Sequence, residues 1–160
     1  MSLLRPALKV WRPSLNSLSS MVDHVAPERR SWLMSRVRAK NTSPELRVRR
    51  VAHRLGLRFR LHPKHLPGKP DLAFPKHRVA LFVHGCFWHR HPNCPKASVP
   101  KTREDFWQSK FDSNVHRDAK VYNQLTALGW RVAVLWECET KTPNEIEIAL
   151  REIFSLHAKI

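Results

Sequence analysis

The sequence predicts a single α/β domain in which helices flank a mixed β-sheet and a metal ion staples one loop. Two apolar segments, 79–83 and 131–136, have the continuous hydrophobic character of strands buried on both faces. Segments with helical periodicity precede, separate and follow them. The run from His84 to Cys94 gathers histidines and cysteines at spacings that suit a tetrahedral metal. At 160 residues, the chain is long enough to bury one core.

The N-terminal third is predicted to be helical. Residues 28–40 form a basic helix with a few apolar members. A second helix begins with a hydroxyl cap at Thr42, has Pro44 and Glu45 in its first turn, and ends at Gly56. Its apolar positions follow the i, i+3, i+4, i+7 spacing of one helix face, at Val48, Val51, Ala52 and Leu55.

Three strands are predicted next, separated by turns rich in Pro and Gly. Apolar residues and arginines alternate over 57–61, which indicates a strand with a basic outer face. A short strand follows over 71–74. The apolar run 79–83 is predicted to be the central strand of the sheet.

Two helices are predicted after the cysteine-rich loop. Thr102 and Asp105 have the residue types that begin a helix, and this short helix runs through Phe111. Asn114 then begins another helix, which Gly129 ends.

The last predicted elements are a strand and a helix. The strand 131–136 is apolar, and Trp130 and Trp136 are assigned to the core. Thr142 and Glu145 form a capping box at the start of the last helix. The predicted order of elements is α-β-β-β-α-α-β-α.

The charge of the chain predicts a polyanionic partner. Lys and Arg number 29 against 13 Asp and Glu, which gives a formal net charge of +16, and nucleic acid is the commonest partner of such a protein. The basic residues are dense between Glu28 and Arg60, so phosphate contacts are predicted there, on Arg36, Arg38 and Lys40. Nonspecific binding of the ribosomal or chromatin type is the alternative that charge alone leaves open.

The domain organisation is predicted to be an N-terminal extension over 1–20 and one domain over 21–160, with a basic arm at about 28–42. The extension has no acid and is rich in Leu, Ser and Arg, a composition weakly like a transit peptide. A disordered arm, or an upstream start with Met21 as the functional beginning, is the favoured interpretation. No apolar run approaches the length of about 18 residues that spans a membrane.

Four side chains are predicted to bind one metal ion. They are Cys86, His91, Cys94 and Cys138. Three of them share one short loop, and the fourth follows the strand 131–136; if that strand lies beside 79–83, the four meet. A closed site with three thiolates and one imidazole is structural and selects zinc. Two alternatives stay open, namely His89 in place of His91, and ordinary buried cysteines.

An aspartate and two histidines form a second candidate site. Asp71 precedes one strand, and His84 and His89 lie at and beyond the end of the next. Mg²⁺ prefers oxygen ligands, so Asp71, the backbone carbonyl of Val83, phosphate oxygens and water can hold it. One imidazole can act as general base and the other can stabilise charge or protonate the leaving group, while Asp118 orients one of them.

The motifs resemble those of the very short patch repair endonucleases, which have a restriction-endonuclease-like fold. They are Leu-Pro-Gly-Lys-Pro-Asp at 66–71, His-Gly-Cys-Phe-Trp-His at 84–89, Phe-Trp at 106–107, Asn-Val-x-Arg-Asp at 114–118 and Leu-Gly-Trp-Arg-Val at 128–132. The wider PD-(D/E)xK class carries Glu-x-Lys on its second strand. This chain has Phe82, Val83 and His84 there, so histidine replaces lysine and the glutamate is absent.

The resemblance implies an Mg²⁺-dependent enzyme with a structural zinc. It would nick one strand of duplex DNA 5′ to the thymine of a T·G mismatch, the product of 5-methylcytosine deamination. The implied metal ligands are Asp71 and the Val83 carbonyl. The implied catalytic histidines are His84 and His89, supported by Asp118.

The resemblance also implies roles outside the reacting centre. It adds the helix residue Glu45 to the catalytic set, and it assigns zinc to the same four ligands. Phe87, Trp88 and Trp107 would wedge into the DNA beside the mismatch, where unstacking costs least. Met34 would insert from the opposite groove.

Three functions follow from these expectations. The leading one is a strand-specific mismatch endonuclease, acting as a monomer in the bacterial cytoplasm with a mismatch-repair protein as a candidate partner. The second is a related nuclease of a restriction or defence system that cuts other DNA. The third is a noncatalytic, zinc-stapled DNA-binding module, against which Asp71, His84 and His89 argue together.

Overall fold

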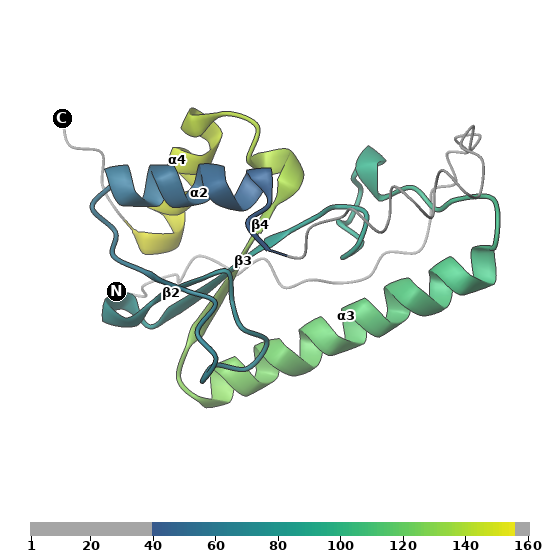
Figure 1. The fold of residues 1–160 in the computed structure, drawn as a ribbon, viewed down its shortest axis with the longest axis horizontal. Helices are drawn as coiled ribbons and strands as arrows, with labels where there is room; N and C mark the ends of the chain where they lie inside the picture. Colours follow the sequence, from purple (N-terminus) through teal and green to yellow (C-terminus); the bar gives the residue numbers. More distant parts are fainter. Residues whose placement is uncertain (1–39, 156–160) are drawn as a thin grey trace, which may run out of the picture.

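The computed structural model describes residues 40–155. A four-stranded sheet forms its middle layer, in the order β1 (Arg60–Leu61), β2 (Leu72–Phe74), β3 (Val79–His84) and β4 (Arg131–Trp136). The helices are α2 (Ser43–Arg54), α3 (Glu104–Ala127) and α4 (Pro143–Phe154). Helices α2 and α4 lie together on one side of the sheet and α3 runs along the other (Figure 1). The predicted basic helix over 28–40, with Met34, Arg36 and Arg38, lies outside the described residues, apart from the exposed Lys40 at its end.

The strands form the mixed sheet that the sequence predicts. Strand β2 pairs antiparallel with both β1 and β3. Strands β3 and β4 are parallel neighbours, and their last residues, His84 and Trp136, are opposite each other. The side chains that follow β3 and β4 therefore emerge at the same edge of the sheet.

The core has two parts because side chains alternate between the faces of the sheet. Leu72, Phe74, Val79 and Leu81 belong to the cluster that packs against α2 and α4. Ala73, Ala80 and Phe82 belong to the cluster under α3, with Leu125. Both faces of the central strands are thus covered, as the apolar run 79–83 predicts.

Capping boxes begin both α2 and α4, whereas the sequence predicted a box for α4 and only a hydroxyl cap at Thr42 for α2. Thr42 Oγ1 accepts a hydrogen bond from the Glu45 amide at 3.4 Å, and the Thr42 amide donates to Glu45 Oε1 at 3.3 Å. Thr142 and Glu145 repeat the arrangement at 3.2 and 2.8 Å. These bonds satisfy amides that have no partner within the helix. Within residues 40–155, no helix has the length and apolar character needed to cross a membrane.

One continuous helix, α3, replaces the two helices predicted over this part of the chain. The predicted break at Asn114 is wrong, because this side chain is buried and its Nδ2 donates to the carbonyl of Trp88 at 2.9 Å. The predicted start at Thr102 is also displaced. The N-cap is Arg103, which has a left-handed φ of 56° and makes no side-chain capping bond.

The strand predicted over 57–61 is shortened to Arg60–Leu61. The Leu57 amide still bonds the carbonyl of Ala52 at the end of α2, at 3.0 Å, and Leu61 is 45% exposed instead of buried. The chain leaves the strand at His62, which has a φ of 44°. The alternation still separates the two sides of this segment, because Leu57 and Phe59 pack on the core whereas Arg58 and Arg60 are exposed.

Candidate active site and metal centre

The candidate site residues gather where β3 and β4 end. Residue Leu72 pairs with Leu81 in the antiparallel register, so Asp71 lies beside the last part of β3. His84 ends β3, and the loop that follows carries His89. The carboxyl ends of parallel strands are common positions for ligand sites in α/β sheets.

Asp71 is anchored to the backbone of β3. Its Oδ2 accepts a hydrogen bond from the Val83 amide at 2.8 Å. Burial raises the pKa of Asp71 to about 6, although the bond from Val83 opposes this shift. A buried carboxylate with one oxygen committed to an amide suits a divalent cation, since such a cation would offset the cost of burying the charge.

A network missing from the sequence-based prediction approaches Asp71 from α2. Arg49 Nη2 donates to Glu45 Oε2 at 2.9 Å and lies 3.0 Å from His62 Nε2. His62 Nδ1 in turn lies 3.7 Å from Asp71 Oδ1. Arginine is only a donor, so His62 Nε2 accepts, and the hydrogen of the neutral ring is on Nδ1, toward Asp71. This network was not recognisable because its members become neighbours only in the fold.

Glu45, predicted as a catalytic residue, belongs to this network. The donor atoms of Glu45, His62 and Asp71 all lie within 4.8 Å of one another. Its carboxylate also closes the capping box of α2 and accepts from the Asn41 amide at 2.9 Å. Glu45 therefore has a structural task that is sufficient to explain its burial.

The two predicted catalytic histidines stack face to face. Their ring centroids are 3.7 Å apart and their planes are 8° from parallel. Each ring has its own partner on α3: His89 Nδ1 bonds Asp118 Oδ2 at 2.5 Å, and His84 Nε2 bonds the Tyr122 hydroxyl at 2.5 Å. Tyr122 was missed in the sequence, although it lies one helical turn after Asp118 and so on the same face.

The electrostatic environments of the two rings differ. Burial, with the neighbouring His89 as the second cause, lowers the pKa of His84 to about 3. Burial alone would raise the pKa of Asp118, but the hydrogen bond from His89 and the charges of both histidines outweigh it and the pKa is lowered. The structure thus pairs a neutral imidazole with an imidazole that is held by a carboxylate.

The four predicted zinc ligands come together beside this pair. The donor atoms of Cys86, His91, Cys94 and Cys138 lie within 4.8 Å of one another. His91 Nδ1 is 3.3 Å from Cys138 Sγ and 3.7 Å from Cys86 Sγ. Three thiols and one imidazole at this spacing fit tetrahedral zinc, in which a metal–sulfur bond is about 2.3 Å long. His89 is occupied elsewhere, so the geometry favours His91 over it as the fourth donor.

Trp136 belongs to this region and not to the core where it was predicted. It is half-buried, and its ring stacks on His91 with centroids 4.3 Å apart and planes 11° from parallel. It also lies 5.7 Å from the His84 ring. Trp136 therefore fills the space between the cysteine cluster and the histidine pair.

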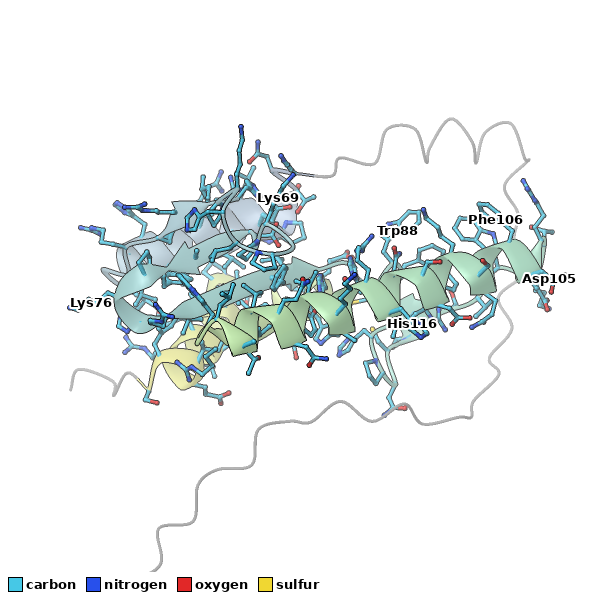
Figure 2. The ribbon with its side chains drawn as sticks, turned by 90° about the horizontal axis from the view of Figure 1, so that it is seen from below. Lys69, Lys76, Trp88, Asp105, Phe106 and His116 are labelled. Atoms are coloured by element: carbon cyan, nitrogen blue, oxygen red, sulfur yellow. The ribbon has the colours of Figure 1, made fainter. Side chains whose placement is uncertain are left out.

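The predicted DNA wedge forms one aromatic cluster. The ring of Phe87 lies 5.1 Å from Trp88 and 5.4 Å from Trp107. Trp107 is only 6% exposed, whereas its neighbour Phe106 is 49% exposed. Trp88 and Phe106 lie along the same edge of α3, and His116 lies along the other (Figure 2). The wedge stays a prediction, and Phe106 is an exposed ring beside it that the sequence analysis did not single out.

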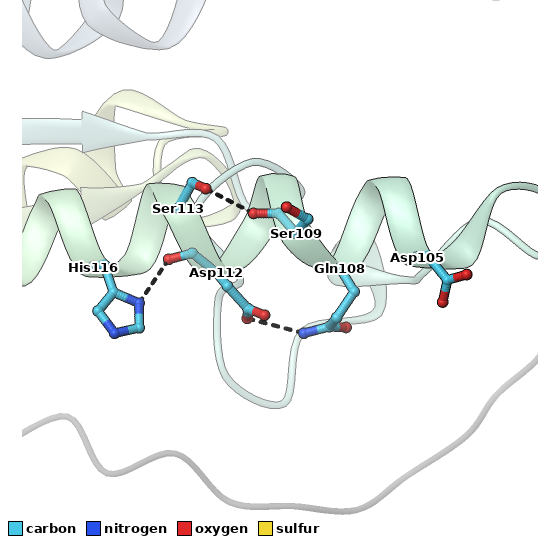
Figure 3. Close-up of a pocket in the computed structure, with 6 residues that line it drawn as sticks. All are labelled: Asp105, Gln108, Ser109, Asp112, Ser113 and His116. Atoms are coloured by element: carbon cyan, nitrogen blue, oxygen red, sulfur yellow. Dashed lines mark hydrogen bonds between the residues drawn. The ribbon is translucent and has the colours of Figure 1, made fainter.

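A shallow pocket on α3 is unrelated to these groups. It is lined by Asp105, Gln108, Ser109, Asp112, Ser113 and His116. Hydrogen bonds along the helix join Gln108 to Asp112, Ser113 to Ser109, and His116 to Asp112 (Figure 3). At about 100° per residue, these positions face away from the side that carries Trp107 and Asp118. The pocket therefore lies on the opposite face of α3 from the candidate active site.

The sequence is similar to those of known DNA endonucleases. Residues 22–96 match the family model described as DNA mismatch endonuclease Vsr. The chain is 51% identical over 133 residues to the type II nicking enzyme V.XorIIP of Xanthomonas oryzae pv. oryzae, covering 83% of this chain and 97% of that protein. It is 40% identical over 121 residues to the type II nicking enzyme V.NmeAIP of Neisseria meningitidis, covering 76% and 86% of the two chains. It is 41% identical over 109 residues to the DNA mismatch endonuclease Vsr of Escherichia coli, covering 68% and 69%.

Proposed function

This chain belongs to the Vsr family of DNA endonucleases, and we propose that it nicks one strand of duplex DNA 5′ to the thymine of a T·G mismatch. The observation that carries the proposal is the position of Asp71, bonded to the Val83 amide at 2.8 Å, beside the stacked His84–His89 pair. The name of the Escherichia coli relative, a DNA mismatch endonuclease, supports the mismatch as substrate.

Mg²⁺ is the proposed cofactor at Asp71. Oδ1 of this carboxylate and the backbone carbonyl of Val83 would hold it, and both are the hard ligands that Mg²⁺ prefers. When bound, Mg²⁺ neutralises charge on the scissile phosphate and lowers the pKa of a bound water. The contact of His62 with Asp71 would orient the carboxylate for this task.

His89 is the proposed general base. The Asp118 carboxylate can only accept, so the His89 Nδ1 that faces it must donate. The neutral ring then has its lone pair on Nε2, which is free to take a proton from the attacking water. As His89 becomes cationic, Asp118 stabilises the charge in the way a carboxylate supports the histidine of a hydrolase triad.

The loop from His84 to Cys94 would also bind the substrate. Zinc on the four clustered donors would lock this loop, since ligand binding is coupled to folding. Phe87 and Trp88 would replace the base stack at the mismatch, and Lys40 would contact phosphate. We propose a monomer in the bacterial cytoplasm, with a mismatch-repair protein as a candidate partner.

The test compares labelled duplexes that differ only in one T·G or C·G pair. With Mg²⁺, we expect a single nick beside the mismatched thymine, none on the C·G duplex, and none with EDTA. Asp71→Ala should lose nicking by a factor of about 100 or more while retaining DNA binding, because it removes the proposed metal ligand.

Each other outcome would identify a different function. Equal cleavage of both duplexes would favour a restriction or defence nuclease, a possibility that the names of the nicking-enzyme relatives keep open. Tight binding without cleavage by metal-loaded protein would favour a DNA-binding module. Unchanged nicking by Asp71→Ala would remove this residue from the mechanism.

A further inference from the structure

Tyr122 gives His84 a partner that the proposed mechanism does not use. It lies on α3 one helical turn after Asp118, so both side chains leave the same face of the helix. Its hydroxyl oxygen is 2.5 Å from His84 Nε2, whereas Asp118 Oδ2 is 3.9 Å from that nitrogen. Helix α3 thus supplies a carboxylate to one ring of the stacked pair and a phenol to the other.

The direction of this hydrogen bond follows from the partners of the phenol. In the part of the chain that the structure describes, Tyr122 Oη bonds His84 Nε2 and no other group. A bond from Nε2–H to Oη would leave the hydrogen of this partly buried phenol without an acceptor, which is costly. A bond from Oη–H to Nε2 satisfies both groups. Burial also raises the pKa of Tyr122, so the phenol keeps its hydrogen at neutral pH.

We propose that Tyr122 is a positioning residue that donates its hydroxyl hydrogen to His84 Nε2 and thereby holds the ring hydrogen of His84 on Nδ1. A neutral imidazole carries one N–H, and a donor at one nitrogen places it on the other. The protein hydrogen bond of His84 involves Nε2, which leaves Nδ1 for the substrate. His84 therefore approaches the substrate as a hydrogen-bond donor and not as a base.

The effect of this hydrogen bond on catalysis rests on the proposed nuclease function. The phosphate that is cleaved gains negative charge on its oxygens, and a fixed N–H aimed at such an oxygen stabilises that charge. His89, on Asp118, presents a lone pair; His84, on Tyr122, presents a hydrogen. The stacked rings would thus perform complementary tasks because α3 gives them different partners.

The first test reads the tautomer and needs no activity. In full-length protein labelled with ¹⁵N-histidine, long-range proton–nitrogen NMR spectra at neutral pH distinguish a protonated ring nitrogen from an unprotonated one. The His84 signals are assigned by their loss in His84→Gln. We expect His84 Nε2 to be unprotonated and Nδ1 protonated in the native protein. A native His84 with its hydrogen on Nε2 would overturn the proposal.

The matched variant is Tyr122→Phe, which removes only the hydroxyl. We expect His84 to shift toward the Nε2–H tautomer that free histidine favours. We also expect the single-turnover nicking rate to fall by about 10- to 100-fold, the range found for residues that orient metal-bound histidines, with unchanged affinity for DNA. The control is Ser113→Ala, which removes a hydroxyl that donates to the Ser109 carbonyl on the far side of the same helix, at 2.8 Å.

The outcomes separate this inference from the proposed function. If Tyr122→Phe leaves both the His84 spectrum and the nicking rate unchanged, Tyr122 has no positioning role. If the spectrum changes as expected but the native protein nicks no duplex, the tautomer assignment stands and the nuclease proposal fails. A lower rate that Ser113→Ala reproduces would reflect disturbance of α3 and would also overturn the positioning role.

Discussion

At the scale of single residues, the proposed chemistry depends on the stacked imidazoles of His84 and His89. Two cationic rings with centroids 3.7 Å apart would repel strongly in this largely buried position, so only one ring can be charged at a time. The carboxylate of Asp118 bonds His89, and the pKa of buried His84 is lowered to about 3. The charge that develops during a reaction therefore belongs on His89.

Asp118→Asn tests this assignment. The amide can donate to His89 Nδ1 and thus favour the wrong tautomer, and it cannot stabilise the cation. We expect the single-turnover nicking rate on a T·G duplex to fall by about 100-fold or more. Asp112→Asn is the matched control, because Asp112 is exposed on the opposite face of α3 and bonds Gln108. Equal rates for the two variants would exclude Asp118 from the mechanism.

At the scale of elements, one face of α3 carries a series of residues that contact the aromatic cluster, the loop after β3 and the core. Its first turns bring Trp107 and Phe111 to the aromatic cluster, and Asn114 then fixes the Trp88 carbonyl. Asp118 follows with the histidine contact, and Leu125 ends this series in the core. A continuous helix keeps these groups in a fixed relation, which two helices joined by a break would not.

The loop before β2 is held against this helix by a glycine. Gly68 has a φ of +68°, and a Cβ built on it would lie 2.3 Å from Val121 Cγ1. We expect Gly68→Ala to lower the free energy of unfolding by about 2–4 kcal/mol, since it combines left-handed strain with overpacking. Gly56→Ala shares the positive φ, at +74°, but meets nothing within 4 Å, so it should cost only about 1–2 kcal/mol. Equal losses of unfolding free energy for the two variants, measured by urea denaturation, would contradict the close contact between Gly68 and Val121.

The elements also show what local sequence can and cannot predict. The strands 79–83 and 131–136 were predictable because short, continuous apolar runs are typical of strands buried on both faces. The expected adjacency of these two strands also placed Cys138 near the other cysteines. The break at Asn114 was wrong because a buried asparagine that bonds a distant carbonyl has the same residue type as a helix cap. Tyr122 and the His62–Arg49 network were missed because their hydrogen-bond partners are far away in the sequence.

At the scale of the whole molecule, one loop after β3 connects the cysteine–histidine cluster, the stacked histidines and the aromatic cluster. Between His84 and Cys94 the chain carries the residues that we propose for catalysis, for stacking on DNA and for zinc binding. The loop has little regular structure. Hydrogen bonds from α3 hold it at Trp88 and His89, and turns such as the bond from His91 N to the Cys86 carbonyl at 3.0 Å hold it internally. Zinc on the four clustered donors would add to the aromatic packing of Phe87 and Trp88 in holding this loop.

His91→Asn tests whether this loop depends on the metal. Loss of one of four donors should release zinc, measured as metal content per chain, and should loosen the loop, measured as faster proteolysis between 84 and 94. The strands and helices outside the loop have their own core, so the circular dichroism spectrum should change little. Nicking should nevertheless be lost, because His89 and Trp88 share the loop.

The control is His116→Asn, at an exposed histidine on α3, which should keep its zinc content, its resistance to proteolysis and its activity. Full nicking by zinc-free His91→Asn protein would mean that packing alone holds the loop, and that the cluster of cysteines serves another purpose.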